Sequence, residues 1–537
     1  MTKPWIVIPA RGGSVGIPRK NLWLLNGKPM VWHAITAAKE VAETVLITDD
    51  DEIAEIGDSL GIHVINEPEQ ATGKRTLDEV ILSYLPEILA LGAKPEDALI
   101  TLQPTSPLIS SESLKDAIEM LQGGGSVLSV SDDRHLRWKK TDSGYQPEYE
   151  QRVNRQLLPE SWRETGAIIG CLIGDFEKNQ TRINQPVKLI PLPEQEAVDI
   201  DSFSDLAVAE YFFGRLSIFF KTDSSESLGM GHVYRVLSLA QELARHNLRI
   251  FTSPDLPLGQ KFFDQYNFDH QQASEDEFIA QVQATKPELV VIDQLDTSKK
   301  LIESIQAASK ETKIVSFEDH GEGAELVDLL VSDLYPNPKI DKSKQLTGIE
   351  NSILAPSFET LDRQIEISET VNEILVLFGG TDPSGLASKA LTALQDAKFA
   401  GRVKLIRGLG AKAINEEFDL DIEYLSNVKN MPKELKTADM ALSSAGRTIS
   451  ELAELGIPTI CLAQNQKELS HSHTTADNGV VMLGLGKDIT AAELSMEITK
   501  LIEDAALRKQ LSENAKKSVA NRSNKQIVAE IMRRLFS

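Results

Sequence analysis

The chain has 537 residues, of which 41% are hydrophobic and 25% are charged. A single hydrophobic core does not organise a chain of this length, so the sequence predicts about two to four domains. The formal net charge of −24 argues against a nucleic-acid-binding protein, because such proteins normally carry a basic face.

Other properties of the whole chain bear on its location. Cys171 and Cys461 lie far apart in apolar stretches, which favours free thiols in a reducing cytoplasm over a disulfide. The N-terminus lacks the basic and apolar regions of a signal peptide, and no apolar stretch is long enough to cross a bilayer. We therefore expect a cytoplasmic protein that binds neither membranes nor nucleic acids.

The N-terminal region begins with a strand that leads into a glycine-rich loop. Trp5 to Pro9 is a short apolar run, typical of a buried strand. In the loop that follows, glycines allow backbone amides to approach a phosphate, and Arg11, Arg19 and Lys20 supply positive charge. The pattern favours a phosphate-binding loop, and a solvated glycine turn is the alternative.

Strand and helix patterns alternate along the following hundred or so residues. The expected helices are Val31 to Ala42, Glu52 to Leu60 and Thr76 to Leu91, and the expected strands are Thr44 to Thr48 and Ala98 to Gln103. Such alternation predicts an α/β domain with a mainly parallel sheet and with sites at the carboxyl ends of its strands.

Six short motifs occur in order along this domain. They are Ile8 to Ser14, Ile17 to Asn21, Thr48 to Asp50, Leu102 to Leu108, Asn154 to Gln156, and the pair Asp199 and Asp201 around Ile200. Alone, the aspartates fit a surface turn. Together the motifs resemble the CMP-sialic acid synthetase family, cytidylyltransferases for nine-carbon keto acids. The resemblance implies a Rossmann-like nucleotidyltransferase domain over residues 1–214.

The resemblance also implies roles for individual side chains. It implies CTP binding at Ala10, Gly12, Gly13, Ser14 and Asn21, catalytic cations at Arg11 and Lys20, nonulosonic acid binding at Gln103, and Mg²⁺ at Asp199 and Asp201. Hard carboxylate oxygens suit Mg²⁺, which neutralises triphosphate charge as the sugar hydroxyl attacks the α-phosphate. A homo-oligomer through this domain is a further expectation. Val15 and Ile109 replace the family's usual Lys and Arg, so a degenerate, non-catalytic module is the alternative.

A second α/β series begins at about residue 215. Leu216 to Phe220 is an apolar strand, and the loop after it delivers Gly231 and His232 to the start of a helix, where amides favour an anion. A histidine at such a place is equally often a helix cap. A polar, charged stretch at about residues 356–372 then separates a further series of strands and helices. We expect two lobes, about 215–365 and 366–537, on either side of a cleft.

The second lobe contains the better candidate for a diphosphate site. Glycines follow two of its strands, at Gly379, Gly380 and Gly446. Gly446 and Thr448 would offer amides and a hydroxyl to phosphate, and Glu451, about one helical turn further on, would accept hydrogen bonds from ribose.

These motifs resemble the UDP-sugar hydrolase of the pseudaminic acid pathway, a relative of glycosyltransferases with the two-lobed GT-B fold. The matching segments are Asp223, Gly229 to Arg235, Phe378 to Pro383, Ser444 to Thr448 with Glu451, and Asn465 with Gln466. The resemblance implies that His232 activates a water molecule at the anomeric carbon, and that Asp223, Arg235, Asn465 and Gln466 bind substrate. A glycosyltransferase is the alternative, because fold does not fix chemistry.

Both resemblances point to a bifunctional enzyme of bacterial nonulosonic acid biosynthesis, of pseudaminic, legionaminic or sialic type. One domain would use CTP and a nonulosonic acid, and the other would hydrolyse a UDP-diacetamido-trideoxyhexose. His471 and His473 fit no metal-ligand spacing and are expected in a solvated loop. The amphipathic tail from Ala491 to Phe536 is expected to pack back on the lobes.

Overall fold

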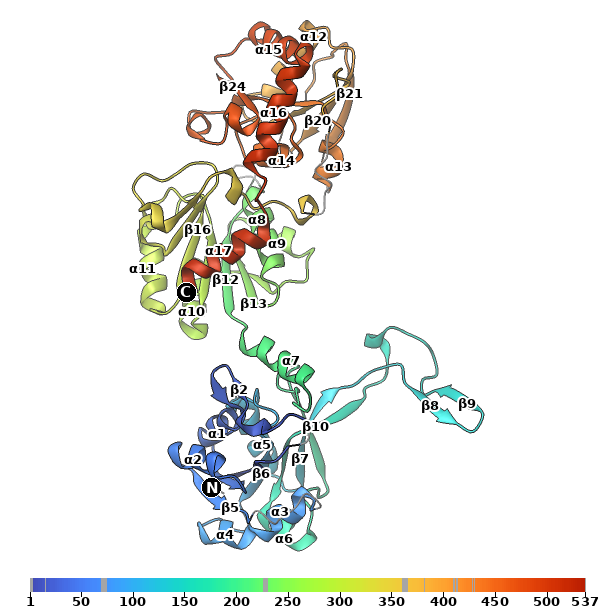
Figure 1. Cartoon of the computed structure of the whole chain (residues 1–537), viewed down its shortest axis with the longest axis vertical. Coiled ribbons are helices and arrows are strands. Elements are labelled where there is room, and N and C mark those ends of the chain that lie inside the picture. Colours follow the sequence, from blue (N-terminus) through green and yellow to red (C-terminus); the bar gives the residue numbers. More distant parts are fainter. Residues whose placement is uncertain are drawn as a thin grey trace. The chain divides into compact units, whose positions relative to one another are not determined.

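The computed structural model describes residues 3–14, 16–68, 75–225, 230–359, 366–380, 382–408, 411, 414–426, 428 and 430–536. The chain divides into two compact units, Met1–Arg215 and Leu216–Ser537 (Figure 1). Across the described ranges, no helix is long and apolar enough to cross a membrane.

The first unit is built on one seven-stranded sheet with the order β11-β7-β10-β6-β1-β4-β5. Only β10 runs antiparallel to its neighbours. The strands are β1 (Trp5–Pro9), β4 (Glu43–Thr48), β5 (His63–Asn66), β6 (Ala98–Leu102), β7 (Ser126–Asp132), β10 (Trp162–Leu172) and β11 (Val187–Pro191). Side chains of β1 alternate between two cores, Ile6 and Ile8 on one face and Trp5 and Val7 on the other. This explains why the strand is apolar throughout, since both faces of the sheet are covered.

Helices cover both faces of this sheet (Figure 1). They are α1 (Met30–Lys39), α2 (Asp51–Ser59), α3 (Leu77–Ser83), α4 (Leu85–Ala90), α5 (Ser111–Leu121), α6 (Ile173–Asn179) and α7 (Phe203–Phe213). The single helix expected from Thr76 to Leu91 is in fact two, separated at Tyr84. Pro86 explains the break, because proline lacks the N–H needed in a helix interior and is tolerated only in a first turn.

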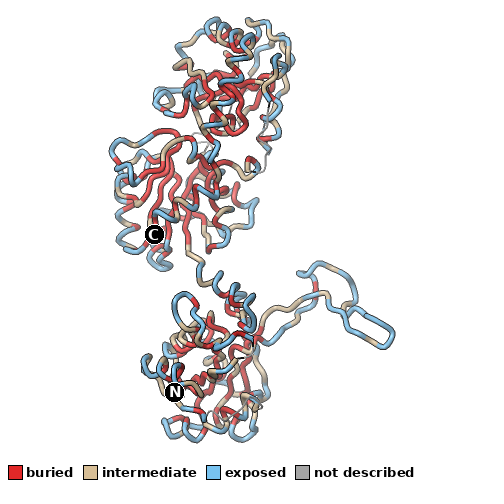
Figure 2. The backbone as a smooth tube through the Cα atoms, in the orientation of Figure 1, coloured by how far each residue is buried: buried red, intermediate tan, exposed pale blue. Residues whose placement is uncertain are grey.

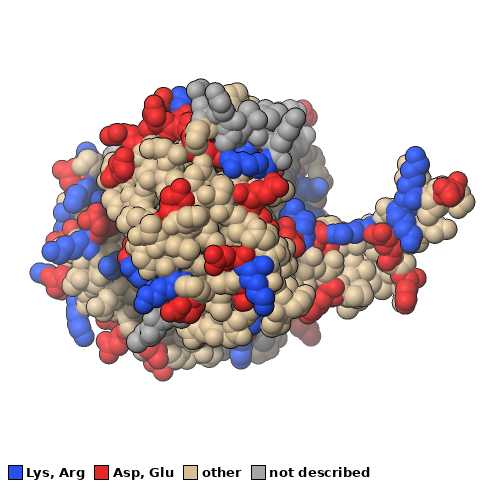
Figure 3. All heavy atoms as spheres, turned by 90° about the horizontal axis from the view of Figure 1, so that it is seen from below, with Lys and Arg blue, Asp and Glu red and all other residues tan. Residues whose placement is uncertain are grey.

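A hairpin projects from the first unit between β7 and β10. Its strands, β8 (Trp138–Thr141) and β9 (Gly144–Pro147), pair with each other and lie away from the main sheet (Figure 1). Most of its residues are exposed, including Trp138 and Tyr145 (Figure 2). Figure 3 shows acidic and basic side chains interspersed on the visible face, with both signs on the projecting segment.

The second unit contains two parallel sheets, one in each lobe. The first has the order β14-β13-β12-β15-β16-β17-β18 and the second β21-β20-β19-β22-β23-β24. The first sheet comprises β12 (Ser217–Thr222), β13 (Asn247–Thr252), β14 (His270–Gln272), β15 (Leu289–Asp293), β16 (Lys313–Phe317), β17 (Leu329–Ser332) and β18 (Gln345–Thr347). The second comprises β19 (Glu373–Leu377), β20 (Arg402–Arg407), β21 (Asp421–Ser426), β22 (Met440–Ser443), β23 (Thr459–Ala463) and β24 (Val480–Leu485).

The chain crosses between the lobes twice. Helices of the first lobe are α8 (Gly231–Glu242), α9 (Pro257–Phe263), α10 (Glu275–Thr285) and α11 (Lys299–Ala308). Those that follow are α12 (Leu386–Asp396), α13 (Met431–Leu435), α14 (Thr448–Leu455), α15 (Ala491–Glu503), α16 (Ala505–Ser518) and α17 (Asn524–Phe536). The expected return of the tail is confirmed, since Ile527 and Ile531 of α17 pack with Phe220 in the first-lobe core. The last helix therefore belongs by packing to the first lobe, although its sequence position suggested the second.

Candidate active sites

The glycine-rich loop of the first unit follows β1 and lies against the end of β4. Ala10 N donates to the carbonyl oxygen of Ile47 at 2.9 Å, and Gly12 N donates to Asp49 Oδ1 at 2.8 Å. A side chain at Gly12 would collide with the Asp50 carboxylate, and one at Gly16 with the carbonyl oxygen of Asp201. These positions need glycine because two carboxylate-bearing segments approach the loop closely.

Lys20 joins this loop to the predicted metal-binding pair. Its Nζ donates to the carbonyl oxygen of Ile200 at 2.7 Å and to Asp201 Oδ1 at 2.9 Å. Asp199 and Asp201 are both exposed, and the Asp201 side chain is 76% exposed. Desolvation, reinforced by the nearby Asp201 charge, raises the pKa of Asp199, against a hydrogen bond from Thr105. The loop, a cation and both aspartates therefore lie together.

The remaining predicted residues of this site differ in their environment. Asn21 is buried and donates to the carbonyl oxygen of Arg11 at 2.9 Å, while Arg11, Gly13 and Ser14 line the loop at least partly exposed. Gln103 Nε2 donates to the carbonyl oxygen of Gly166 at 3.0 Å. Ile109 is buried in the apolar core, so no cation occupies that position. Val15 lies outside the described residues.

In the second unit, His232 forms a buried pair with Asp293. His232 is the second residue of α8, and Asp293 is the last residue of β15. Nδ1 of the histidine lies 2.6 Å from Oδ1 of the aspartate. Burial alone would raise the pKa of Asp293, but Arg235 and His232 outweigh it and hold this pKa well below its ordinary value. Because a carboxylate only accepts hydrogen bonds, Nδ1 carries a proton, and in the neutral imidazole Nε2 is then the acceptor.

Arg235 lies behind this pair and does not face open space. Its side chain is 2% exposed, and it donates from Nε to Asp293 Oδ2 and from Nη2 to Oδ1, both at 2.6 Å. On its far side Arg235 Nη1 lies 3.8 Å from Glu318 Oε1. Burial and the neighbouring Asp333 carboxylate raise the pKa of Glu318. The predicted substrate contact is thus engaged with protein carboxylates.

Sequence reasoning missed the three carboxylates of this buried group. Asp293 ends β15, Glu318 follows β16, and Asp333 follows β17. All three strands are neighbours in one parallel sheet. The signal was present in the sequence as an acidic residue at the carboxyl end of each successive apolar strand, where such folds place their sites.

The second lobe places its candidate diphosphate cradle at the start of α14. Gly446 precedes this helix, Thr448 is its first residue and Glu451 lies in its first turn. Burial raises the pKa of Glu451 to about 7, partly opposed by Arg447. Gly379 and Gly380 follow β19 and are exposed. Arg447 donates to the carbonyl oxygen of Gly231 at 3.0 Å, so the cradle lies near the His232 helix.

The other predicted substrate residues lie on loops that follow strands. Asp223, just after β12, is buried and accepts from Ser253 N at 2.9 Å and from Gln294 Nε2. Asn465 and Gln466, after β23, are exposed, and Asn465 Oδ1 accepts from Glu468 N at 3.1 Å.

The expectation of a solvated loop at His471 and His473 was wrong. The two histidines are 9% and 2% exposed. His471 Nδ1 lies 2.6 Å from the carbonyl oxygen of Ala445, and its ring stacks on Tyr335 with centroids 5.5 Å apart. The rings therefore pack against the loop that precedes α14. The spacing of metal ligands in the sequence gives no information about such burial.

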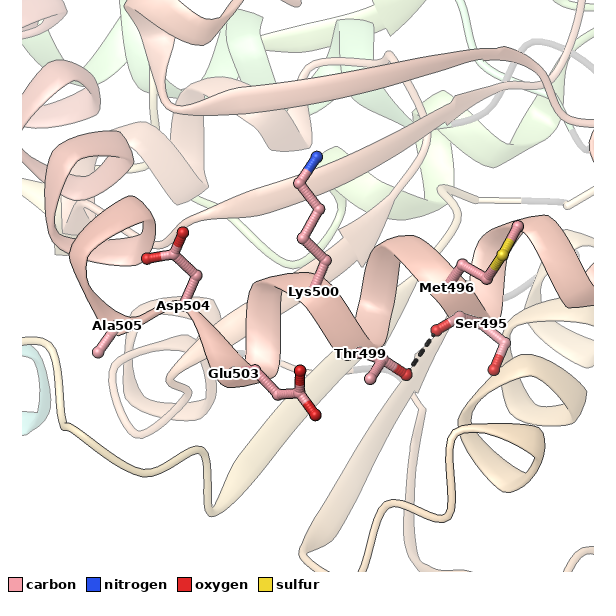
Figure 4. Close-up of a pocket in the computed structure, with 7 residues that line it drawn as sticks. All are labelled: Ser495, Met496, Thr499, Lys500, Glu503, Asp504 and Ala505. Carbon is pink, nitrogen blue, oxygen red and sulfur yellow. Dashed lines mark hydrogen bonds between the residues drawn. The ribbon is translucent and has the colours of Figure 1, made fainter.

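A separate hollow lies on the outer helices of the second lobe (Figure 4). It is lined by Ser495, Met496, Thr499, Lys500, Glu503, Asp504 and Ala505. None of these is a predicted site residue, and most belong to the single helix α15. The hollow is therefore unrelated to either candidate site.

Comparison with known proteins separates the two units. Residues 5–150 match the family model Cytidylyltransferase, and residues 374–531 match the Glycosyltransferase family 28 C-terminal domain. Together with the sheets, these matches confirm the predicted α/β class, with a nucleotidyltransferase-like first domain and a GT-B-like second one. Neither match supports the expectation of a hydrolase.

Individual relatives follow the same division. CMP-N,N'-diacetyllegionaminic acid synthase of Legionella pneumophila is 30% identical over 38% of this chain and 93% of its own length. Spore coat polysaccharide biosynthesis protein SpsG of Bacillus subtilis is 24% identical over 53% of this chain and 89% of its own length. A crystal structure of Acinetobacter baumannii MurG covers 59% of this chain and 99% of its own at 14% identity and a TM-score of 0.44.

The chain spans about half the length of several other curated relatives, for example 55% of an uncharacterized Methanocaldococcus jannaschii protein and 54% of Streptococcus agalactiae N-acylneuraminate cytidylyltransferase. Similarity to the Legionella protein covers nearly all of that relative. Through its first unit the chain belongs to the same family as this synthase, and its residues 374–531 match the glycosyltransferase family 28 C-terminal domain.

Proposed function

We propose that the first unit transfers CMP from CTP to a nonulosonic acid. The anomeric hydroxyl of the acid attacks the α-phosphate, a new P–O bond forms, and pyrophosphate leaves with the electrons of the broken bond. The observation that carries this proposal is the contact of Lys20 with Asp201 beside the glycine-rich loop. The Legionella relative, a CMP-N,N'-diacetyllegionaminic acid synthase by name, supports the substrate class.

The residues of this site suit a triphosphate and a divalent cation. Loop amides and Arg11 would bind phosphate oxygens, and Lys20 would turn from Asp201 toward the triphosphate. Asp199 and Asp201 would hold Mg²⁺, which when bound offsets phosphate charge. The fit is supported by two carboxylates on either side of Ile200, since the raised pKa of Asp199 indicates that a nearby cation would stabilise its ionised form. No described group of three or more His, Cys, Asp or Glu residues could hold a metal, so substrate and water would complete the shell.

Release of pyrophosphate tests this proposal. The full chain is incubated with CTP, Mg²⁺ and a panel of sialic, legionaminic and pseudaminic acids, with Asp201→Ala as the control variant. Release with one of the acids, and its loss in the variant, is expected. Absence of release with every acid would mean that the first unit is a non-catalytic module, as the apolar Ile109 allows.

For the second unit we propose cleavage of a UDP-sugar with His232 as the base. The buried contact between His232 and Asp293 carries this proposal, because it leaves Nε2 to take a proton from the attacking hydroxyl. The oxygen of that hydroxyl bonds to the anomeric carbon, and the bond from this carbon to UDP breaks. Gly446 and Thr448 at the N-terminus of α14 would hold the departing diphosphate.

The attacking hydroxyl belongs either to a sugar acceptor or to water. The family 28 match favours a transferase, and the name of the Bacillus relative, a spore coat polysaccharide biosynthesis protein, is consistent with this. Hydrolysis remains the prediction from motif resemblance alone. Measuring UDP release from a panel of UDP-diacetamido sugars distinguishes hydrolysis from transfer. Release in buffer without acceptor means hydrolysis, and release only on addition of an acceptor sugar means transfer. His232→Ala should abolish either.

We also propose that the first unit forms a homo-oligomer. The hairpin of β8 and β9 exposes Trp138 and Tyr145 at 58% and 71%, and these rings lie outside every core cluster found among the described residues. A second copy of the chain would cover them. Such exposed aromatic side chains are typical of protein interfaces.

A further inference from the structure

Arg447 lies between the two candidate diphosphate-binding residues of the second lobe and reaches into the first. It follows Gly446 and precedes Thr448, the first residue of α14. Its Nη1 donates to the carbonyl oxygen of Gly231 at 3.0 Å, and its Nη2 to that of Ile353 at 2.8 Å. Gly231 begins α8, so the first contact ends directly beside His232.

The second contact is made where the chain crosses between the lobes. Ile353 packs in the first-lobe core and Leu354 in a core of the second. The Asn524 side chain bonds to both Leu354 N and Leu354 O, at 3.1 and 2.7 Å. Ser352 Oγ donates to Ser450 Oγ of α14 at 2.8 Å. The crossover is therefore fixed, and the guanidinium of Arg447 spans from this fixed point to the His232 helix.

Charge also connects Arg447 to the residues behind His232. Burial and the Arg235 cation lower the pKa of Arg447, while the carboxylates of Asp333, Asp293 and Glu318 oppose this shift. The two guanidinium groups and three carboxylates thus form one electrostatic group that includes the partner of His232. A lysine would keep the charge of Arg447 but would lose the planar fork that reaches two carbonyl oxygens.

We propose that Arg447 is a positioning residue that couples nucleotide binding in the second lobe to the placement of His232 in the first. The inference rests on the proposed cleavage of a UDP-sugar. A diphosphate held by Gly446 and Thr448 fixes the backbone on both sides of Arg447, and the fork transmits this constraint to Gly231. A bound nucleotide therefore holds His232 more firmly in the position that folding gives it.

Hydrogen–deuterium exchange with UDP alone as the probe tests this coupling in the full chain. In the unmodified protein, UDP should slow exchange both at α14 and in the first turn of α8. In Arg447→Ala, protection at α14 should persist and protection at α8 should disappear. Arg447→Lys should restore little of it. Arg402→Ala is the matched control, because the Arg402 side chain is exposed and pairs with surface acids of its own sheet, with Glu423 at 3.6 Å.

Kinetics give a second readout. Arg447→Ala should lower kcat by up to about 10²-fold, as expected when a catalytic group is misplaced, while UDP affinity falls much less. Persistent protection of α8 in Arg447→Ala would overturn the proposal, and so would a large loss of UDP affinity with kcat retained, which would make Arg447 a direct ligand. If the unmodified chain does not bind UDP, the proposed function of the second unit fails instead.

Discussion

Replacing Asp293 with asparagine tests the chemistry of the second unit most directly. The Asp293 carboxylate is fully buried and accepts one contact from His232 and two from Arg235, each at 2.6 Å. An amide presents only one acceptor atom, so its NH₂ group must face either His232 or Arg235. Facing His232, it forces Nδ1 to accept and moves the ring proton to Nε2, where it blocks the base. If the NH₂ group faces Arg235, it places one hydrogen-bond donor against another, the guanidinium N–H.

The expected losses in kcat and in unfolding free energy can each be given a magnitude. A base held in the wrong tautomer loses on the order of 10⁴-fold in kcat, as in the serine-protease triad. Removing one partner of a buried ion pair costs about 3–5 kcal/mol of unfolding free energy, because Arg235 is left uncompensated. We therefore expect Asp293→Asn to lose UDP-sugar cleavage almost completely and to melt at a lower temperature.

The assay measures UDP release and thermal unfolding of the same preparations. Asp264→Asn is the matched control, because Asp264 also contacts a histidine, His270 Nε2 at 3.0 Å, but with 55% of its side chain exposed. This variant should keep both the activity and the melting temperature. If folded Asp293→Asn released UDP at the unmodified rate, His232 would not be a base oriented by Asp293.

Three further results are expected. Lys20→Met and Asp201→Asn should each cut pyrophosphate release by about 10²-fold or more, while the melting temperature of the first unit changes little in Asp201→Asn, because the Asp201 side chain is 76% exposed. Pyrophosphate release at the unmodified rate in both variants would exclude these residues from the site. Burial lowers the pKa of His473 to about 4, so the unfolded chain binds the extra proton first and stability should fall as the pH drops from about 6.5 toward 4. His473→Phe should reduce the dependence of the melting temperature on pH in this range. An unchanged slope of melting temperature against pH would contradict the argument. Trp138→Ser with Tyr145→Ser should lower the mass measured by light scattering, whereas an unchanged mass would exclude the hairpin as the oligomer contact.

Periodicity and motif order predicted the fold class because both are local. The run from Trp5 to Pro9 is apolar at each position since both faces of its sheet are buried. Gly12 and Gly16 after it are required because the Asp50 carboxylate and the Asp201 carbonyl oxygen approach them closely. The break at Tyr84 was also readable, because Pro86 stands in the expected helix. What a local pattern does not contain is the partner of a side chain. Arg235 is one helical turn from His232 in sequence, yet only the sheet shows that both meet Asp293.

The same distinction explains the histidines after β23. His471 and His473 stand in a polar stretch, and polarity of neighbours predicts exposure only when the backbone stays at the surface. Here the segment returns beneath the cradle loop, where His471 contacts Ala445 and stacks on Tyr335 of the first lobe. Burial of this kind depends on a contact between lobes, so it was not available from spacing.

The ion pairs of the two candidate sites differ in solvent exposure, and this difference bears on how each site would work. In the first unit the Lys20 side chain is 13% exposed but its partner Asp201 is 76% exposed, so solvent screens their contact and an incoming triphosphate displaces it at lower cost than a fully buried pair. In the second unit Asp293 is 0% and Arg235 2% exposed, and separating them costs about 3–5 kcal/mol. The first site is therefore assembled by its substrate, whereas the second is assembled by folding and needs only the lobes to be held in place. Changes of charge in the first unit should alter catalysis alone, and those in the second should alter catalysis and stability together.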